Sequence, residues 1–217
     1  FHSPTSEAVN SVTLRNVNEQ PHSLPMIPLN IPTSTGEEQH FVAQLMREPA
    51  LLSKGHFTKK CADWFKTNYQ TPHLFLTKSC TSALEMTAML VGIQPGDEVV
   101  LPSFTFVSAA NAFVLRGAKL VFVDLDPETM NIAPQKIEAA ITEKTKAILI
   151  MHYAGMACDM ERIMEIAQHH QLPVIEDAAH CINAKWRGRH LGTIGDAGCL
   201  SFDHSKNITC SQGGVLF

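Results

Sequence analysis

The sequence predicts an α/β fold in which a mostly parallel β-sheet carries helices on both faces. Short apolar or β-branched runs alternate with amphipathic segments of helix length, and turn residues separate them. The runs are apolar at nearly every position, as in strands that are buried on both faces of a sheet. After residue 26 no internal repeat or flexible linker interrupts the pattern, which favours one continuous domain.

Five segments of this pattern are predicted strands, each rich in Val, Ile, Leu or Phe. They cover residues 73–77, 98–102, 119–126, 146–151 and 172–177. An apolar strand also precedes Lys206, and residues 213–217 have the composition of another. In a parallel sheet ligands bind at the carboxyl ends of the strands, so the residues that follow these segments are the candidates for chemistry.

Four predicted helices lie between the strands. They cover residues 81–91, 107–116, 134–142 and 159–170. Gly117 is expected to end the second helix, because glycine readily adopts the left-handed conformation found at helix C-termini. Asp159 is expected to cap the N-terminus of the fourth, where a carboxylate can accept a free backbone N–H.

The composition is that of a globular protein without a polyanionic partner. The chain has 217 residues, of which 45% are apolar and 18% charged, enough apolar surface for a sizeable core. Lys and Arg number 17 against 21 Asp and Glu, and no basic cluster is present. Nucleic acid and membrane surfaces are therefore not expected partners. The six cysteines form no CxxC pair, so reduced thiols are expected rather than disulfides or a metal site.

The first 25 residues differ from the remainder. They are polar and aperiodic, and they lack both the basic start and the apolar centre of a secretory signal. We interpret residues 1–25 as a flexible extension or a gene-boundary artefact, and we expect the domain to occupy residues 26–217. No apolar run approaches the roughly 20 residues needed to span a bilayer. A cytoplasmic protein is expected.

Polar and aromatic residues follow the first two strands. Thr81 and Ser82 begin a helix, where free N–H groups and the helix dipole suit a phosphate. On this turn alone, an ordinary cap by Ser79 or Thr81 is the simpler interpretation. Phe106 follows the second strand and could lie flat on a planar cofactor, although core packing is the commoner role of such a ring. Neither a Walker loop nor a GxGxxG fingerprint is present, which disfavours a dinucleotide-binding oxidoreductase.

Two acids and a lysine follow later strands. Glu176 and Asp177 end a very apolar strand, where a carboxylate needs a partner such as a helix N-terminus, an Arg or a protonated heterocyclic nitrogen. Lys206 lies soon after another apolar strand; most lysines are merely solvated, but one at a carboxyl-end crevice can form a Schiff base with a carbonyl group. A phosphate-binding helix end, an aromatic ring, an acid and a lysine are together what pyridoxal 5′-phosphate needs.

Five blocks of the sequence resemble the DegT/DnrJ/EryC1/StrS family of sugar aminotransferases. They cover residues 54–65, 77–86, 96–124, 174–180 and 195–214, in the order and spacing of the family. The resemblance implies the pyridoxal-phosphate-dependent aspartate-aminotransferase architecture of fold type I. It also implies that residues 26–217 are a cofactor-binding large domain, truncated before a small C-terminal domain. The family's enzymes are homodimers with a shared active site.

The resemblance implies catalytic roles for three residues. Lys206 would bind the cofactor covalently and move the proton between the substrate carbon and the cofactor. Asp177 would pair with the pyridinium nitrogen and keep it protonated. His180 would lie near the phenolic oxygen of the cofactor.

Four further residues would bind the cofactor without taking part in proton transfer. Phe106 would stack on the ring, Thr81 and Ser82 would hold the phosphate through backbone N–H groups, and Ser201 would add its hydroxyl to the phosphate. The chain departs from the family pattern elsewhere. Asp203 and Gln212 stand where the family commonly has His and Glu, and Asp203 adds an acid near the lysine.

The implied reaction transfers an amino group from L-glutamate to the C4 ketone of a nucleotide-linked 4-keto-6-deoxyhexose. Residues 54–65 and 110–124 are most similar to transaminases that convert dTDP-4-keto-6-deoxyglucose to dTDP-4-amino-4,6-dideoxygalactose for enterobacterial common antigen. A UDP- or GDP-linked keto sugar is the alternative substrate. A non-catalytic truncated fragment of the same fold is the alternative from another class. Lys206 argues against the dehydratase branch of the family, in which His replaces the lysine.

Overall fold

The structure is a computed structural model that describes residues 27, 28, 30–32, 34–48, 50, 51 and 55–217. Residues Pro32–Phe217 form one compact unit. The extension expected at residues 1–25 lies outside the described residues. In the part of the chain that is described, no helix is long and apolar enough to cross a membrane.

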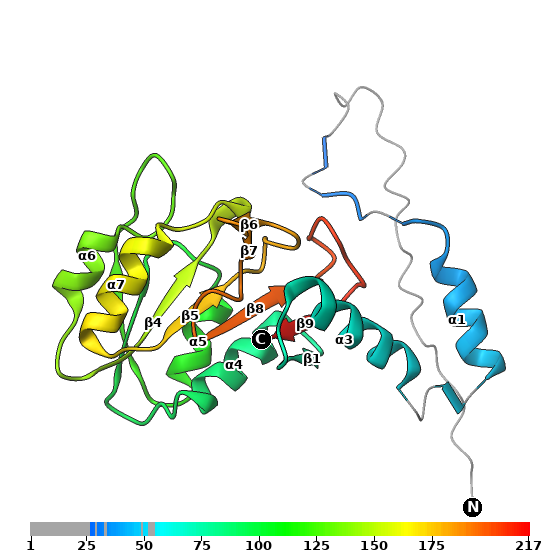
Figure 1. Ribbon diagram of the computed structural model, residues 1–217, viewed down its shortest axis with the longest axis horizontal. Helices are drawn as coiled ribbons and strands as arrows, with labels where there is room; N and C mark the ends of the chain where they lie inside the picture. Colours follow the sequence, from blue (N-terminus) through cyan, green and yellow to red (C-terminus); the bar gives the residue numbers. More distant parts are fainter. Residues whose placement is uncertain (1–26, 29, 33, 49, 52–54) are drawn as a thin grey trace, which may run out of the picture. The chain divides into compact units, whose positions relative to one another are not determined.

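A seven-stranded sheet with the order β1-β9-β8-β5-β4-β2-β3 forms the centre of this unit (Figure 1). Its strands are β1 (Phe75–Thr77), β2 (Glu98–Pro102), β3 (Lys119–Val123), β4 (Thr145–Met151), β5 (Val174–Asp177), β8 (Ala197–Ser201) and β9 (Gly214–Leu216). β9 runs antiparallel to both of its neighbours, β1 and β8. The remaining neighbours are parallel, so the predicted mostly parallel sheet is confirmed.

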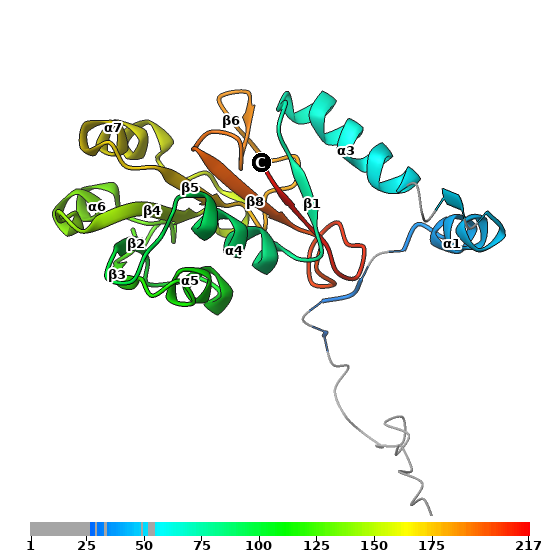
Figure 2. The same ribbon diagram turned by 90° about the horizontal axis from the view of Figure 1, so that it is seen from below.

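Helices cover both faces of the sheet (Figure 2). One apolar cluster contains side chains of α3 (His56–Tyr69), α6 (Pro134–Ala140) and α7 (Met160–His170). A second cluster contains side chains of α4 (Cys80–Leu90) and α5 (Val107–Val114). The remaining elements are α1 (Glu38–Arg47), a short 3-10 turn (Tyr153–Gly155), and a hairpin of β6 (Lys185–Trp186) and β7 (Arg189–His190). The sheet is therefore the middle layer of three.

The strands divide their side chains between the two clusters, because successive residues of a strand point to opposite faces. In β2, Val100 belongs to the cluster of α3, α6 and α7, whereas Val99 belongs to that of α4 and α5. In β5, Val174 and Ile175 divide in the same way. The same alternation sends Glu176 and Asp177, the next two residues, to opposite faces of the sheet.

The predicted strands and helices between residues 73 and 177 are all present, and their ends differ from the prediction by three residues or fewer. Asp159 caps α7 as predicted, accepting a hydrogen bond from the Arg162 N–H at 3.2 Å. Gly117, just past α5, has φ +85°, and a Cβ there would meet the Pro95 backbone at 2.9 Å. The sequence pattern did not predict α3 or the β6–β7 hairpin.

Candidate active site

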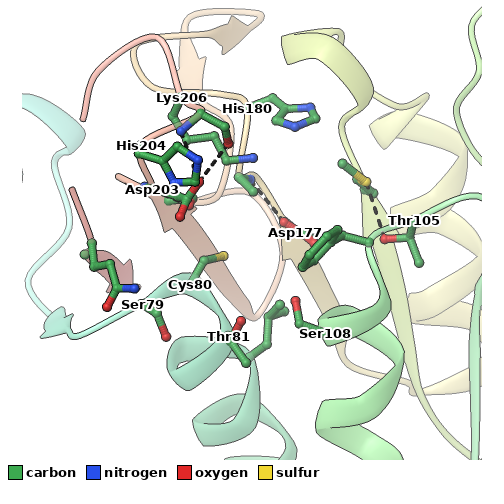
Figure 3. Close-up of a pocket in the computed structure, with 18 of the residues that line it drawn as sticks. Ser79, Cys80, Thr81, Thr105, Ser108, Asp177, His180, Asp203, His204 and Lys206 are labelled. Carbon is green, nitrogen blue, oxygen red and sulfur yellow. Dashed lines mark hydrogen bonds and ion pairs between the residues drawn. The ribbon is translucent and has the colours of Figure 1, made fainter. Parts of the chain in front are cut away.

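A cavity of about 850 Å³ opens at the carboxyl ends of the strands (Figure 3). Segments that follow β1, β2, β4, β5 and β8 contribute to its lining, as expected for a parallel sheet. Six of the predicted site residues line this one cavity: Thr81, Phe106, Asp177, His180, Ser201 and Lys206. Ser82, the seventh, does not line it.

The N-terminus of α4 forms one wall of the cavity. Ser79 is the N-cap, and its Oγ accepts a hydrogen bond from the Ser82 N–H at 3.1 Å. The cap occupies the Ser82 N–H, which leaves the N–H groups of Cys80 and Thr81 for an anion. Gly214 of β9 lies against this turn, since a Cβ there would meet the carbonyl carbon of Ser79 at 2.6 Å. Only glycine fits that close approach.

Asp177, the last residue of β5, is buried with few partners. It is 3% exposed, and its Oδ1 accepts a hydrogen bond from the Ala179 N–H at 3.1 Å. Within the described residues, this is the single hydrogen bond that its carboxylate accepts. Burial raises the pKa of Asp177, and the Ala179 N–H and the charge of Lys206 oppose that rise. A cation placed against this carboxylate would relieve the cost of its burial.

Glu176, one residue earlier, is fully buried and fully partnered. Its Oε1 accepts hydrogen bonds from the N–H groups of Ile194 and Gly195, both at 2.6 Å. Its Oε2 accepts hydrogen bonds from the Gly192 N–H and from Nε2 of His152, both at 2.8 Å. Burial raises the pKa of Glu176, but the hydrogen bonds from the ring and the backbone outweigh burial and leave that pKa below its ordinary value.

His180 is held in one tautomer. Its Nδ1 accepts a hydrogen bond from the Ala154 N–H at 3.2 Å, so the proton of the neutral ring lies on Nε2. Ala154 belongs to a short 3-10 turn (Tyr153–Gly155) and has φ +52°, in the left-handed region. Burial and the nearby charge of Lys206 both lower the pKa of His180, which favours the neutral ring at neutral pH.

Lys206 lies in the loop between β8 and β9, and Asp203 shapes the turn that carries it. The Lys206 N–H donates to the backbone oxygen of Asp203 at 2.9 Å. Oδ1 of Asp203 accepts hydrogen bonds from the N–H and the hydroxyl of Ser205, at 3.0 and 2.8 Å. The Ser205 N–H lowers the pKa of Asp203, so the acid is charged at neutral pH. Ser201 Oγ accepts the Asp203 N–H at 3.3 Å, and its own proton remains available to a ligand.

Aromatic rings form another part of the lining. Phe106 is 70% exposed, which leaves room for a planar group against its ring. Tyr153 and Phe104 also line the cavity, with ring centroids 5.3 Å apart. Sequence reasoning missed both residues. Tyr153 follows β4 as Phe106 follows β2, so the strand-end rule applied to every strand would have found it.

These groups fit pyridoxal phosphate. The cavity has the size of a small-molecule site and combines a lysine, a buried carboxylate with one hydrogen bond, and the free N–H groups of a helix N-terminus. An amine, an acid and a phosphate cradle are the features by which proteins hold this cofactor. The cavity also lies at the carboxyl edge of the sheet, where open α/β sheets bind their ligands.

The chain belongs to the DegT/DnrJ/EryC1/StrS aminotransferase family, whose sequence model matches residues 32–217. It is 40% identical over 190 residues to the spore coat polysaccharide biosynthesis protein SpsC of Bacillus subtilis, covering 88% of this chain and 49% of that protein. It is 39% identical over 193 residues to GDP-perosamine synthase of Caulobacter vibrioides, covering 89% and 52%. The chain thus spans about half the length of the curated relatives it matches.

Solved structures confirm the predicted fold class. The putative sugar aminotransferase Spr1654 of Streptococcus pneumoniae, solved in a PLP-form, matches with a TM-score of 0.80 at 28% identity, over 88% of this chain and 52% of that chain. The aminotransferase TlmJ of Streptoalloteichus hindustanus matches with a TM-score of 0.80 at 35% identity, over 88% and 52%. The family inferred from the five sequence blocks is likewise confirmed.

Proposed function

We propose that the full-length protein is a pyridoxal-phosphate-dependent aminotransferase that acts on a nucleotide-linked 4-keto-6-deoxyhexose. One observation carries the proposal: Lys206, Asp177 and the N-terminus of α4 line a single cavity. These groups correspond to the amine, the acid and the phosphate site that the cofactor requires. Family membership supports amino transfer as the reaction. L-glutamate is the proposed donor, as the family resemblance implies.

Three residues would divide the proton chemistry among them. When bound, pyridoxal phosphate draws electrons away from the substrate carbon that loses its proton. Lys206 Nζ would hold the cofactor and carry the proton to and from that carbon. Asp177 would hold the proton of the ring nitrogen, since a cation there stabilises a buried carboxylate. His180 would donate its Nε2–H to the phenolic oxygen.

The remaining predicted residues would hold and orient the cofactor. Thr81 would offer its backbone N–H to the phosphate at the start of α4, and Ser201 would donate its hydroxyl. Phe106 would stack on one face of the ring. Ser82 could use its N–H for the phosphate only after releasing the Ser79 cap.

The nucleotide of the substrate has two leading candidates. The similarity at residues 54–65 and 110–124 favours a dTDP-linked sugar with dTDP-4-amino-4,6-dideoxygalactose as the product. Two relatives named GDP-perosamine synthase, from Caulobacter vibrioides and Escherichia coli O157:H7, are 39% and 37% identical and favour a GDP-linked sugar. A UDP-linked sugar is the third possibility. All three would use the same cofactor site, so a direct comparison of substrates distinguishes them.

We further propose that residues 26–217 form most of the cofactor-binding domain of a cytoplasmic homodimer with shared active sites. The matched relatives are about twice as long as the aligned segment. We expect a small C-terminal domain and the partner subunit to supply the remaining substrate contacts. The segment of residues 1–217 is therefore expected to be inactive by itself, and steady turnover by this segment would contradict that expectation.

A coupled assay tests the function. The full-length protein is loaded with pyridoxal phosphate and given L-glutamate with a dTDP-, UDP- or GDP-linked 4-keto-6-deoxyhexose, and 2-oxoglutarate is measured. We expect continuous 2-oxoglutarate release with one of the three sugars, and no more than one equivalent per active site without a sugar, because the sugar is needed to regenerate the aldehyde form of the cofactor. A folded full-length protein that stays colourless with added cofactor, as a non-catalytic relative would, contradicts the proposal.

A further inference from the structure

A buried hydrogen-bond network joins three neighbouring strands of the sheet, on the face opposite to the one that Asp177 occupies. Glu176 lies in β5, His152 directly follows β4, and the turn of residues 192–195 leads into β8. Both side chains are fully buried, with 0% exposure. The Glu176 carboxylate is the centre of the network, because it accepts hydrogen bonds from both His152 and the turn.

The donors and acceptors of this network have a fixed polarity. The Cys158 N–H donates to Nδ1 of His152 at 3.0 Å, which places the ring proton on Nε2. That proton is donated to Glu176 Oε2, which also accepts the Gly192 N–H. An amide of the same shape carries an NH₂ group in place of one carboxylate oxygen. This donor would face one of the N–H groups that the carboxylate accepts. Only a carboxylate satisfies all of the donors at once.

Each strand joined by the network carries a part of the cavity. Asp177 is the next residue after Glu176, and Ser201 ends β8. His152 leads into the turn that contains Tyr153 and Ala154, and the Ala154 N–H fixes the tautomer of His180. A change that breaks the contact of His152 with Cys158 would therefore loosen the segment that orients His180.

We infer that Glu176 and His152 are positioning residues, which hold Asp177 in place and keep His180 in its Nε2–H tautomer for cofactor binding. This inference rests on the proposed function. In E176Q the amide cannot satisfy both Gly192 and His152, so the ring must rotate or move its proton and lose the Cys158 N–H. The unpaired donor lowers stability whether or not the cofactor is bound; cofactor affinity falls because Asp177 and His180 must be brought back into place on binding, for which we expect about a 10-fold loss.

Two measurements on the full-length protein test the inference. Titration with pyridoxal phosphate gives the dissociation constant, and ¹⁵N NMR of the histidine rings in the cofactor-free protein gives the tautomer of His180. We expect E176Q to bind about 10-fold more weakly and to show a mixture of His180 tautomers instead of Nε2–H alone. The matched control is E165Q, the same change at an exposed glutamate paired with Arg162 at 3.1 Å, which should alter neither.

A milder variant covers the case in which E176Q fails to fold. H152Q keeps an N–H donor for Glu176 and removes the ring acceptor for Cys158, so it should give the same NMR change. If the wild-type protein binds the cofactor and the variants match it in affinity and in His180 tautomer, the inference is wrong and the proposed function stands. If the folded wild-type protein binds no pyridoxal phosphate, the proposed function itself fails.

Discussion

Glu176 and Asp177 are adjacent carboxylates in the same strand, both buried, and their surroundings are opposite. Glu176 accepts four hydrogen bonds, and its pKa is lowered. Asp177 accepts one within the described residues, and its pKa is raised by burial. The alternation of side chains along a strand sends one acid into the packed interior and the other into the cavity. Both acids are buried, so the number of hydrogen bonds that each accepts, rather than its burial, distinguishes the structural Glu176 from the candidate catalytic Asp177.

The comparison extends to what each group should contribute. A buried group whose hydrogen bonds are all made within the protein stabilises the fold. A buried group with unused hydrogen-bonding capacity destabilises the free protein and is relieved by a ligand. Changes at Asp177 should therefore alter function more than stability, and changes at Glu176 should alter stability first.

Removing the amine of Lys206 has the largest expected effect. K206A should lower kcat of the full-length enzyme by at least about 1000-fold, because no other group replaces a proton-transfer residue that also binds the cofactor. Unfolding stability should stay within about 0.5 kcal/mol of wild type, because Lys206 is only half-buried and no side-chain hydrogen bond of Lys206 is seen among the described residues. The control is K146A, at an exposed lysine of β4. Retention of more than a tenth of the wild-type activity would show that Lys206 is not the proton carrier.

D177N should separate activity from stability. The rate of 2-oxoglutarate release should fall about 100-fold, since the amide cannot hold the ring nitrogen protonated. The cofactor-free protein should become more stable by about 1 kcal/mol at pH 7, because a buried charge is removed. The raised pKa means that the folded state binds this proton more tightly than the unfolded state, so wild-type stability falls as pH rises through the folded pKa.

Urea unfolding of the cofactor-free proteins at several pH values measures this effect. The stability gained by D177N should grow from acid to neutral pH. The exposed Asp63 of α3 provides the control D63N, for which no such gain is expected. A D177N protein that is less stable than wild type at pH 7 would show that the Asp177 carboxylate stabilises the cofactor-free protein, as Glu176 does, and would contradict the proposed difference between the two acids.

E176Q should destabilise the cofactor-free protein by about 2 kcal/mol at pH 7, since it leaves a buried donor unpaired. The lowered pKa of Glu176 means that its contribution is present above the ordinary glutamate pKa and is lost as pH falls through the folded pKa. The two proteins should therefore converge in acid. Thermal unfolding at a series of pH values from 7 down to about 3 measures this, and a difference between the two proteins that does not shrink toward acid pH would contradict it.

S79A has the smallest expected effect. It tests Ser79, which both caps α4 and lines the cavity. Loss of the cap on α4 should cost about 1 kcal/mol in a urea unfolding experiment. Cofactor affinity should hold, because the substitution frees the Ser82 N–H for the phosphate. A large loss of affinity with no loss of stability would mean that Ser79 contacts the phosphate directly.

Much of the fold could be predicted, because burial on both faces leaves a local pattern in each strand. The bounds of β2 match the prediction, and Asp159 caps α7 as expected. The antiparallel pairing of β9 with β1 could not be read locally, since Thr77 and Gly214 are far apart in the chain.

In the candidate site, too, local features could be predicted from the sequence and long-range contacts could not. The strand-end rule selected Asp177 and Lys206, and both line the cavity. It also required a partner for Glu176 without identifying it, because the partners lie at His152 and in the turn of residues 192–195. The alternation of side chains along a strand would have placed Glu176 and Asp177 on opposite faces of the sheet, but only the fold shows which face holds the cavity.

Mapping the covalently bound cofactor tests the central claim most directly. The full-length protein is loaded with pyridoxal phosphate, reduced with borohydride, digested and analysed by mass spectrometry. We predict a yellow protein whose absorbance band disappears on reduction, with the label on Lys206. Label on Lys78, the other lysine among the described residues lining the cavity, or no retained cofactor in a folded protein, would contradict the account.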